Sequence, residues 1–589
     1  MRTSPYLLLI ITLMLFQACN NKVIDKPDKN PNIILIVTDD QGIGDIGYTG
    51  NPYIKTPVLD SLASSAYLLE NFYVSPVCAP TRSSLMTGRY SVRTGIHDTY
   101  NGGATMASEE VTIAEILCDN GYQTAMFGKW HLGDNYPFRP SDQGFDVSLY
   151  HKSGGIGQVG DIDNFYKFDS SYFNPVLYFN NERIQTEGFC SDVFTSYAID
   201  FIEDNSDKPF FLYLAFNAPH APLQVPGGYL EIYNELVNDL REEEKEEFLS
   251  KSMTDRDMES AKRVYGMVSN IDDNIGLLTK ALREKQLVEN TIIIFLTDNG
   301  PAQNRYRCGL RNRKGSVYEG GVKVPAFIVL PGSGNKSITQ TLAHIDVLPT
   351  VLDLANIEYE NRNKIDGSSF LPIIEGKKTG IFDARALISN WQRGYPEPYR
   401  NISVRKGDFK MVGHTSYDKE SKLELFNIST DPYEINDISS TEPDKLIHLK
   451  EEFDSWYMDI IHNEKLKAQY AIIGSDMEEE IILNRNDAGG EPGIWAQDEV
   501  FGYWHIECIR SSEYKISINF KEKINTIGKL VLKIAPLQRT VDIKEPGSSE
   551  VIIENIYIPR GKYMVECWLQ SADGRKIFPF YIRISENIK

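Results

Sequence analysis

The sequence predicts a doubly wound α/β domain followed by a region rich in antiparallel strands. The first part of the chain holds short apolar runs with the length of strands that are buried on both faces, a pattern typical of a parallel sheet. These runs lie at residues 33–37, 210–216, 292–296 and 326–330. Helical patterns separate them, and this alternation indicates helices that cover both faces of the sheet.

The C-terminal region has a different pattern. Around residue 390 the sequence becomes polar and rich in turn residues, and strand-like runs then precede a charged helical stretch at about 442–464. Beyond residue 474, polar and apolar residues alternate strictly in several runs, one of them at residues 514–520. Period-two alternation with turn signals between the runs predicts a β-sandwich.

The chain has 589 residues, a length that suggests roughly three to four domain-sized units. We expect an α/β domain at residues 32–389, a smaller subdomain at 390–470 and an appended β-sandwich at 475–589. The sandwich could bind substrate, although an accessory unit that only packs on the rest of the protein is the plainer interpretation.

Residues 1–19 have the features of an export signal. Arg2 precedes an apolar run at residues 6–16 that is too short to span a membrane. The run leads to Ala18-Cys19, which resembles a bacterial lipoprotein cleavage site with Cys19 as the lipidated first residue, and residues 20–31 have the composition of a tether. We expect export across the inner membrane of a Gram-negative bacterium to the periplasm or outer membrane, with membrane attachment by the lipid only. Plain secretion without lipidation is the alternative.

The overall charge and the cysteines exclude several classes of protein. A formal net charge of -21 argues against a nucleic-acid partner and gives no long-range attraction for a polyanion, so an anionic substrate must be bound by local cations. The cysteines other than Cys19 and Cys78 have no close paired spacing, which argues against a disulfide framework and against a zinc site. Cys508 and Cys567 both lie in strand-like runs and could pair, but two free core thiols are the more common outcome.

The segment at residues 78–89 combines a reactive cysteine, a rigid turn and a cation in the sequence Cys-Ala-Pro-Thr-Arg-Ser-Ser-Leu-Met-Thr-Gly-Arg. Pro80 suits the first position of a helix that starts beside Cys78, where free N–H groups and the helix dipole favour an anion. An ordinary buried cysteine before a helix that begins near Arg82 is the plainer interpretation, but so many fixed positions in one short segment argue against it.

Cys-x-Pro-Ser/Thr-Arg followed by Leu-x-Thr-Gly-Arg resembles the signature of the type I sulfatases, among them the arylsulfatase A-like carbohydrate sulfatases of bacteria. The resemblance covers residues 32–460 approximately. It implies an alkaline-phosphatase-like α/β domain and a smaller subdomain of an antiparallel sheet with a packed helix. It also implies that a maturation enzyme converts Cys78 to formylglycine. The hydrated aldehyde of formylglycine carries two hydroxyls on one carbon, of which one attacks sulfur and the other later expels sulfate.

Acidic and amide side chains follow two of the predicted strands. Asp39 and Asp40 come shortly after the first apolar run, and Asp298 and Asn299 come shortly after the third. Either pair alone could cap a turn, but with the cysteine motif between them these hard oxygen ligands predict a site for calcium or magnesium. The family resemblance assigns these four residues as calcium ligands, with the formylglycine from Cys78 completing the coordination.

Three further segments match sulfatase patterns and carry basic residues. Lys129 and His131 lie in Lys-Trp-His-Leu-Gly, His220 in Ala-Pro-His-Ala-Pro, and Lys314 in Arg-Lys-Gly-Ser-Val-Tyr-Glu-Gly-Gly. Lone histidines are usually structural, and a lysine in a charged run is usually solvated.

The resemblance implies a catalytic role for each of these residues. Calcium and Arg82 orient the formylglycine, while Lys129, Lys314 and His220 neutralise the sulfate oxygens. His220 protonates the leaving alcohol, and His131 takes the proton from the second hydroxyl.

The substrate is predicted from a looser resemblance. The segment from Gly154 through Gln158 to Tyr172 looks like the corresponding segment of bacterial carbohydrate sulfatases that act on 4-O-sulfated galactose or N-acetylgalactosamine. Trp391 and Arg393 are further candidates for sugar contact, though an ordinary surface tryptophan is equally compatible with the sequence. We therefore expect exo-acting removal of sulfate from a sulfated glycan. A phosphate-ester hydrolase of the same superfold and an inactive carbohydrate-binding relative are the alternatives.

Overall fold

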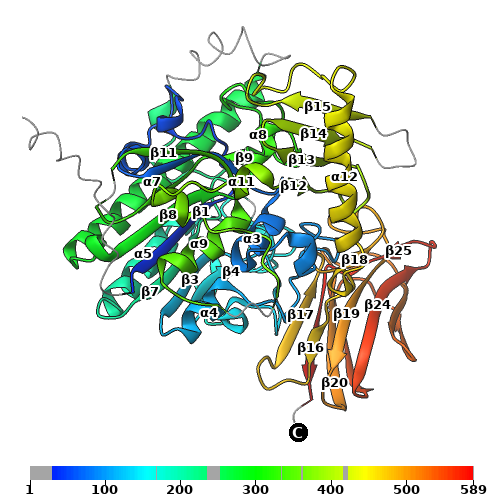
Figure 1. Ribbon diagram of the computed structural model, residues 1–589. Helices are drawn as coiled ribbons and strands as arrows, with labels where there is room; N and C mark the ends of the chain where they lie inside the picture. The colour runs from blue at the N-terminus through cyan, green and yellow to red at the C-terminus, as the bar shows by residue number, and fades with distance from the viewer. Residues whose placement is uncertain are drawn as a thin grey trace, which may run out of the picture.

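The computed structural model describes residues 30–587, apart from 168, 235–252, 333, 360–362 and 416–421 (Figure 1). The predicted export signal, Cys19 and most of the predicted tether lie outside the described residues. Among the described residues, no helix is long and apolar enough to cross a membrane.

The α/β domain is built on one large mixed sheet with the strand order β11-β2-β10-β8-β1-β7-β3-β4-β5-β6, with β9 paired to β2. The central strands β8, β1, β7, β3 and β4 are parallel, as predicted. The strands are β1 (Asn32–Thr38), β2 (Tyr67–Tyr73), β3 (Gln123–Lys129), β4 (Val147–His151), β5 (Val176–Phe179), β6 (Glu182–Gln185), β7 (Phe210–Ala215), β8 (Thr291–Thr297), β9 (Lys323–Val324), β10 (Ala326–Val329) and β11 (Lys336–Ala343).

One expectation about strand direction is wrong. The apolar run at residues 326–330 forms β10, which is antiparallel to both of its neighbours, β8 and β2. The strand is buried like the parallel ones, so its apolar composition carries no information about its direction.

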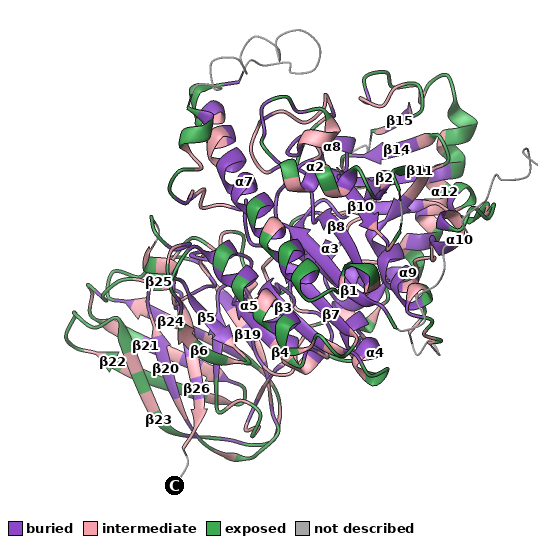
Figure 2. Ribbon diagram, turned by 90° about the vertical axis from the view of Figure 1, so that its left-hand side faces the viewer, coloured by how far each residue is buried: buried purple, intermediate pink, exposed green. Residues whose placement is uncertain are grey.

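Helices cover both faces of this sheet. Alternate residues of β1 point to opposite faces. Ile33 and Leu35 pack with residues of α3, α4 and α9, whereas Ile34 and Ile36 pack with residues of α2, α5 and α7. Figure 2 shows the central strands buried beneath these helices. The helices of the domain are α2 (Pro57–Ala63), α3 (Cys78–Thr87), α4 (Ile113–Asp119), α5 (Cys190–Asp204), α7 (Asp255–Glu284), α8 (Glu319–Val322), α9 (Val347–Leu354), α10 (Leu371–Ile374) and α11 (Ile381–Ala384).

The smaller subdomain contains an antiparallel sheet and a long helix. The sheet has the order β12-β13-β14-β15, and Leu449 and Phe453 of α12 belong to the same apolar cluster as Val404 and Met411 of the sheet. Its elements are β12 (Leu387–Asn390), β13 (Ile402–Lys406), β14 (Phe409–Gly413), β15 (Leu423–Asn427) and α12 (Pro443–Ile460).

The C-terminal region is a sandwich of two sheets, drawn in orange to red in Figure 1. One sheet has the order β16-β19-β24-β21-β22, with β18 and β25 at its side, and the other has the order β17-β26-β20-β23. Cys508 and Cys567 lie in its core as free thiols. The strands are β16 (Ala471–Ile473), β17 (Glu480–Asn484), β18 (Gly489–Gly490), β19 (Gly502–Cys508), β20 (Ser512–Asn519), β21 (Gly528–Ile534), β22 (Leu537–Ile543), β23 (Glu550–Ile558), β24 (Gly561–Ser571), β25 (Lys576–Ile577) and β26 (Tyr581–Glu586).

The sandwich is hydrogen-bonded to the α/β domain. The side chain of Asn135 exchanges two hydrogen bonds with the backbone of Ile482, at 2.9 and 3.0 Å. Nearby, Asn484 donates to Asp134 at 2.9 Å, and the backbone N–H of Tyr136 donates to Glu478. The predicted separate module is therefore fastened to the loop that follows β3.

Candidate active site

The predicted site residues gather at the carboxyl ends of the central parallel strands. Asp39 and Asp40 follow β1, His220 follows β7, Lys129 ends β3, and Asp298 follows β8. Since these strands are parallel neighbours, their carboxyl ends meet at one edge of the sheet, which is where ligands bind in open α/β folds.

Cys78 is the first residue of α3 and is buried. The sequence predicted Pro80 at the first position of this helix. The helix begins two residues earlier, so Pro80 occupies its third position. This position costs little, because the N–H groups of the first helical turn have no partner within the helix. The free N–H groups of this turn and the positive end of the helix dipole lie beside residue 78.

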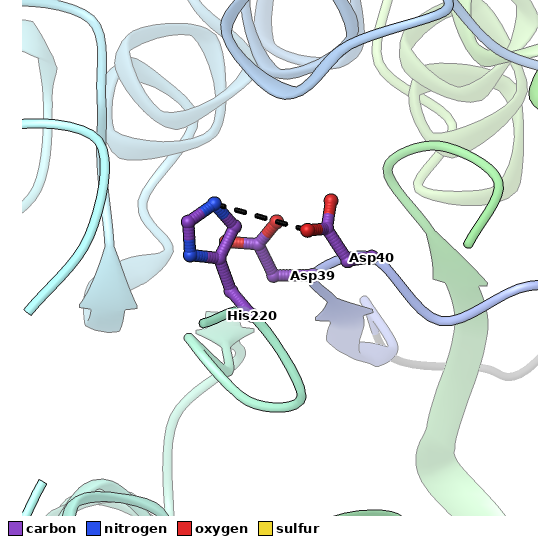
Figure 3. Close-up of side chains that lie close together, drawn as sticks. All are labelled: Asp39, Asp40 and His220. Carbon is purple, nitrogen blue, oxygen red and sulfur yellow. Dashed lines mark ion pairs between the residues drawn. The ribbon is translucent and has the colours of Figure 1, made fainter. Parts of the chain in front are cut away.

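Carboxylates surround the cysteine. Possible ligand atoms of Asp39, Cys78 and Asp298, one from each residue, lie within 4.8 Å of one another. The same holds for Asp39, Asp40 and His220, which Figure 3 shows. The Oδ1 atoms of Asp39 and Asn299 are buried and have no hydrogen-bond partner among the described residues. Buried oxygens without a donor are costly unless a cation satisfies them.

Fixed cations match these carboxylates one for one. Nζ of Lys129 lies 2.5 Å from Oδ2 of Asp39, and Nζ of Lys314 lies 2.5 Å from Oδ1 of Asp40. Arg82 donates from Nε and Nη2 to Oδ2 of Asp298, at 3.1 and 2.7 Å. The protein charges therefore cancel, and a bound divalent cation would leave the site with a positive charge that suits an anion.

The approach of β3 to β7 places Lys129 in the cluster. Gly128 has a φ of 119°, and a Cβ at this position would lie 1.8 Å from the carbonyl oxygen of Ala215. Only glycine permits this approach without a displacement of the backbone.

The pKa values of the carboxylates diverge. Burial opposes ionisation of Asp40, but Lys314 and His220 outweigh it and lower its pKa well below the usual value. Burial, together with the charge of Asp39, raises the pKa of Asp298 to about 6. Asn299 donates from Nδ2 to Asp40 at 2.8 Å, which leaves its amide oxygen free to coordinate.

His131 faces the cysteine with a ring nitrogen that can accept a proton. Its Nδ1 lies 3.4 Å from Sγ of Cys78, and its Nε2 lies 2.9 Å from the carbonyl oxygen of Thr99. A carbonyl oxygen only accepts, so Nε2 carries the hydrogen and Nδ1 presents its lone pair to residue 78. Burial and the nearby Lys129 lower the pKa of His131 well below its usual value, which keeps it neutral.

His220 is held in the opposite tautomer. Its Nδ1 lies 2.8 Å from the carbonyl oxygen of Ala221, so Nε2 is the free nitrogen, 3.8 Å from Oδ2 of Asp40. Burial lowers the pKa of His220 to about 3, although Asp40 opposes the shift. His220 is therefore neutral in this site, and it needs an additional anion beside it to hold a proton.

The candidate sugar-binding residues lie around this cluster. Nε2 of Gln158 lies 3.5 Å from Nδ1 of His220. The ring of Trp391 packs on Gly315, next to Lys314. The contact is close, since a Cβ on Gly315 would lie 3.1 Å from the ring. Arg393 forms an ion pair with Asp98, a fully buried residue that also accepts from Trp391 at 3.3 Å.

Several residues of the site were missed by the sequence-based prediction. Asp98 and Thr99 join Arg393 to His131, and Tyr213 accepts from Arg82 at 3.2 Å. Tyr172, which ends the predicted substrate segment, donates to the carbonyl oxygen of His220 at 2.7 Å. The turn residues of the segment after Asp98, Thr-Tyr-Asn-Gly-Gly, signal a loop, but no local pattern shows that this loop reaches the site.

Comparisons with known proteins identify relatives of this chain. The family model described as Sulfatase matches residues 31–357, and the model described as N-sulphoglucosamine sulphohydrolase, C-terminal, matches residues 312–461. Arylsulfatase A of Homo sapiens is 32% identical over 409 residues, which are 64% of this chain and 74% of the relative. N-acetylgalactosamine-6-sulfatase of Sus scrofa is 29% identical over 458 residues, which are 69% of this chain and 81% of the relative.

A solved structure extends the comparison to the fold. Ps i-CgsB in complex with k-i-k-neocarrahexaose has 27% sequence identity and a TM-score of 0.64, and the match covers 74% of this chain and 94% of that chain. The predicted alkaline-phosphatase-like α/β fold is therefore confirmed.

Proposed function

Because this chain belongs to the sulfatase family and is thus a sulfuric ester hydrolase that acts on sulfated carbohydrates, we propose that it removes a 4-O-sulfate from galactose or N-acetylgalactosamine at the end of a glycan. One observation carries the hydrolase assignment. A buried cysteine at a helix start lies within one cluster of carboxylates, fixed cations and neutral histidines. The choice of sugar is supported by the segment from residue 154 to 172 and by a relative named N-acetylgalactosamine-6-sulfatase.

We propose that the carboxylate cluster holds calcium and that Cys78 is converted to formylglycine by a maturation enzyme. Asp39, Asp40, Asp298 and Asn299 would hold the ion, since all offer hard oxygen ligands and two of their buried oxygens lack a donor. When present, the ion polarises the oxygens bound to it, and a hydrated aldehyde at residue 78 supplies two hydroxyls on one carbon.

The side chains of the site divide the remaining work. Lys129 and Lys314 neutralise Asp39 and Asp40 in this structure, and with a cation on these carboxylates the two ammonium groups would be available to bind sulfate oxygens. Arg82 holds Asp298 in place. His131 accepts the proton of a hydroxyl at residue 78 through Nδ1.

His220 supplies the proton for the leaving alcohol. Its free Nε2 faces the cluster, and the negative sulfate ester provides the charge that this buried ring needs to hold a proton. Loss of one donor to the reacting oxygens should slow the reaction by about 10²–10³.

A panel of sugars tests the assignment. Mono- and disaccharides sulfated at single positions are incubated with the matured, calcium-loaded enzyme, and released sulfate is measured. We expect a preference for the 4-O-sulfated galacto sugars, because a site that hydrogen-bonds sugar hydroxyls leaves polar groups unpaired with the wrong epimer. Preference for 6-O-sulfated sugars would correct the position alone. Activity restricted to phosphate esters would favour the phosphatase alternative, and binding without turnover would favour an inactive relative.

We also propose that the enzyme is exported and anchored through lipidated Cys19. The signal-like run at residues 6–16 and the Ala18-Cys19 junction support this location. Membrane fractionation of the wild type and of Cys19→Ser tests it. The wild type should sediment with membranes and the variant should not.

A further inference from the structure

A row of side chains leads from the active site to the β-sandwich. It consists of Trp391, Arg393, Tyr100 and Trp495, and we call it the 391–495 row. The guanidinium of Arg393 lies over the rings of Trp391 and Tyr100, with its Cζ at 5.0 and 3.8 Å from their centroids. Tyr100 in turn stacks on Trp495, with ring centroids 5.7 Å apart and an interplanar angle of 23°.

The row begins in the catalytic cluster. Trp391 packs on Gly315, which follows Lys314 in the chain. Nη1 of Arg393 donates to Asp98 and, at 3.0 Å, to Oγ1 of Thr99, whose carbonyl oxygen also holds the ring of His131. The inner end of the row is therefore fixed by groups that touch the reacting residues.

The row ends on the appended sandwich. Trp495 lies in a short turn between β18 and β19, beside Ile494, which is buried in the sandwich core. The backbone N–H of Gly490 donates to Oδ1 of Asn101 at 3.2 Å, next to Tyr100. The loop that carries Tyr100 is thus held between the active site on one side and the sandwich on the other.

The row has unused capacity for a polar ligand. In the described part of the protein, Arg393 donates from Nη1 only, so its Nε and Nη2 hydrogens have no protein acceptor. Its side chain is 39% exposed, and Trp391, Tyr100 and Trp495 are all half-buried. Trp495, at the end of the stack, combines half-buried aromatic surface with the nearby hydrogen-bond donors of Arg393, a combination that suits a sugar ring and its oxygens.

We propose that the 391–495 row extends the substrate site across the domain boundary, and that Trp495 of the β-sandwich binds a sugar residue beyond the one that loses sulfate. The occupant is a sulfated oligosaccharide whose second and third residues lie along the row. This inference rests on the proposed function, because it takes the sulfated sugar as the anchor in the catalytic cluster. It also gives the sandwich a role in substrate selection by length.

The test compares two substrates in the full-length, matured, calcium-loaded enzyme. One is the preferred sulfated monosaccharide, and the other is a tetrasaccharide that ends in the same sulfated sugar. Trp495→Ala should lower kcat/KM for the tetrasaccharide about tenfold, mainly through KM, and leave the monosaccharide nearly unchanged. Trp495→Phe should recover part of the loss, because it keeps an aromatic face.

Two variants serve as controls. Trp568→Ala removes a tryptophan of the same sandwich that contacts Phe501, Lys533 and Lys576. Glu478→Gln weakens a different contact with the α/β domain. Neither should change the ratio of the two kcat/KM values. An equal loss for both substrates in Trp495→Ala would show that Trp495 only packs the domains together, and no loss for either would also overturn the inference.

A binding measurement separates this inference from the proposed function. The affinity of the tetrasaccharide is measured by calorimetry for Cys78→Ala and for Cys78→Ala with Trp495→Ala. A weaker affinity in the double variant supports the row even if the wild type does not turn this sugar over. Equal affinities overturn the row, whereas an inactive wild type with intact Trp495-dependent binding overturns only the proposed reaction.

Discussion

Sγ of Cys78 lies 3.4 Å from Nδ1 of His131, and the hydrogen of that ring is held on the other nitrogen by the carbonyl oxygen of Thr99. The geometry fixes both the tautomer and the direction of the lone pair. The ring is buried and neutral, so it is prepared to accept a proton from residue 78 rather than to donate one. His131 has a φ of 59°, an unusual value outside glycine that points to a constrained site.

Substitution of His131 should separate the two halves of the reaction. In His131→Ala, the first proton transfer to the leaving alcohol remains with His220, but the proton acceptor at residue 78 is lost. We expect about one equivalent of alcohol per enzyme in a rapid burst, followed by turnover slowed by about 10²–10⁴. Rapid-quench measurement of alcohol and sulfate checks this, and equal slowing of the burst and the steady state would contradict it.

Cys78 should be required for activity but not for folding. Its side chain is small and neutral in the helix start, so Cys78→Ala should keep a melting temperature close to that of the wild type and lose sulfate release. Expression of the wild type without a suitable maturation enzyme should likewise give folded, nearly inactive protein. Peptide mass analysis of residue 78 tests the modification directly. Full turnover by Cys78→Ala would refute its assignment as nucleophile.

The clustering of the acidic residues that we propose as metal ligands could be predicted because it depends on one rule. Asp39 and Asp298 each follow a short, fully apolar run, and the carboxyl ends of parallel strands share one edge of the sheet. The apolar run that forms β10 did not reveal its direction, since this strand is apolar and almost fully buried like the parallel strands. An apolar strand sequence indicates that the strand is buried, whereas the direction in which strands pair depends on the connections between them.

Contacts between distant segments of the chain escaped prediction for a related reason. The pair Asp98 and Arg393 is separated by 295 residues, and the stack of Tyr100 on Trp495 crosses a domain boundary. Each of these residues looks like ordinary loop sequence, and only the packing of the domains brings them together. The sandwich was predicted from its alternation, but alternation identifies a core and gives no information about the loops that touch another domain.

Removal of the metal should lower both activity and stability. Chelation leaves Asp39, Asp40, Asp298 and Asn299 with their protein partners alone, so the two buried oxygens that lack a donor lose the cation that satisfies them. An ion present at 100 times its Kd stabilises the folded state by about 2.7 kcal/mol, and this contribution should disappear as a drop in Tm. Calcium should restore both properties, and Asp39→Asn should need more calcium for the same recovery. Unchanged values after chelation, or binding of two zinc ions, would favour the phosphatase alternative.

Asp161 should make the stability of the protein depend on pH. Burial raises its pKa to about 7 in the folded protein, even though the N–H of Gly157 and the amide of Asn164 donate to it. The unfolded chain releases this proton near pH 4, whereas the folded protein retains it until about pH 7. Between these values the folded state binds more protons than the unfolded state, so the contribution of this group to stability falls as pH rises.

Asp161→Asn tests this prediction, because the amide oxygen can still accept from Gly157 but cannot ionise. The difference in Tm, variant minus wild type, should grow from pH 4 to pH 7 and then stay constant. A difference between two proteins cancels the titration of all other groups, so its pH dependence reports residue 161 alone. Asp163→Asn is the control, since Asp163 is a nearby carboxylate that is paired with the exposed Arg183. A flat difference for Asp161→Asn, or an equal slope for both variants, would show that Asp161 is ionised in the folded protein at pH 5–6.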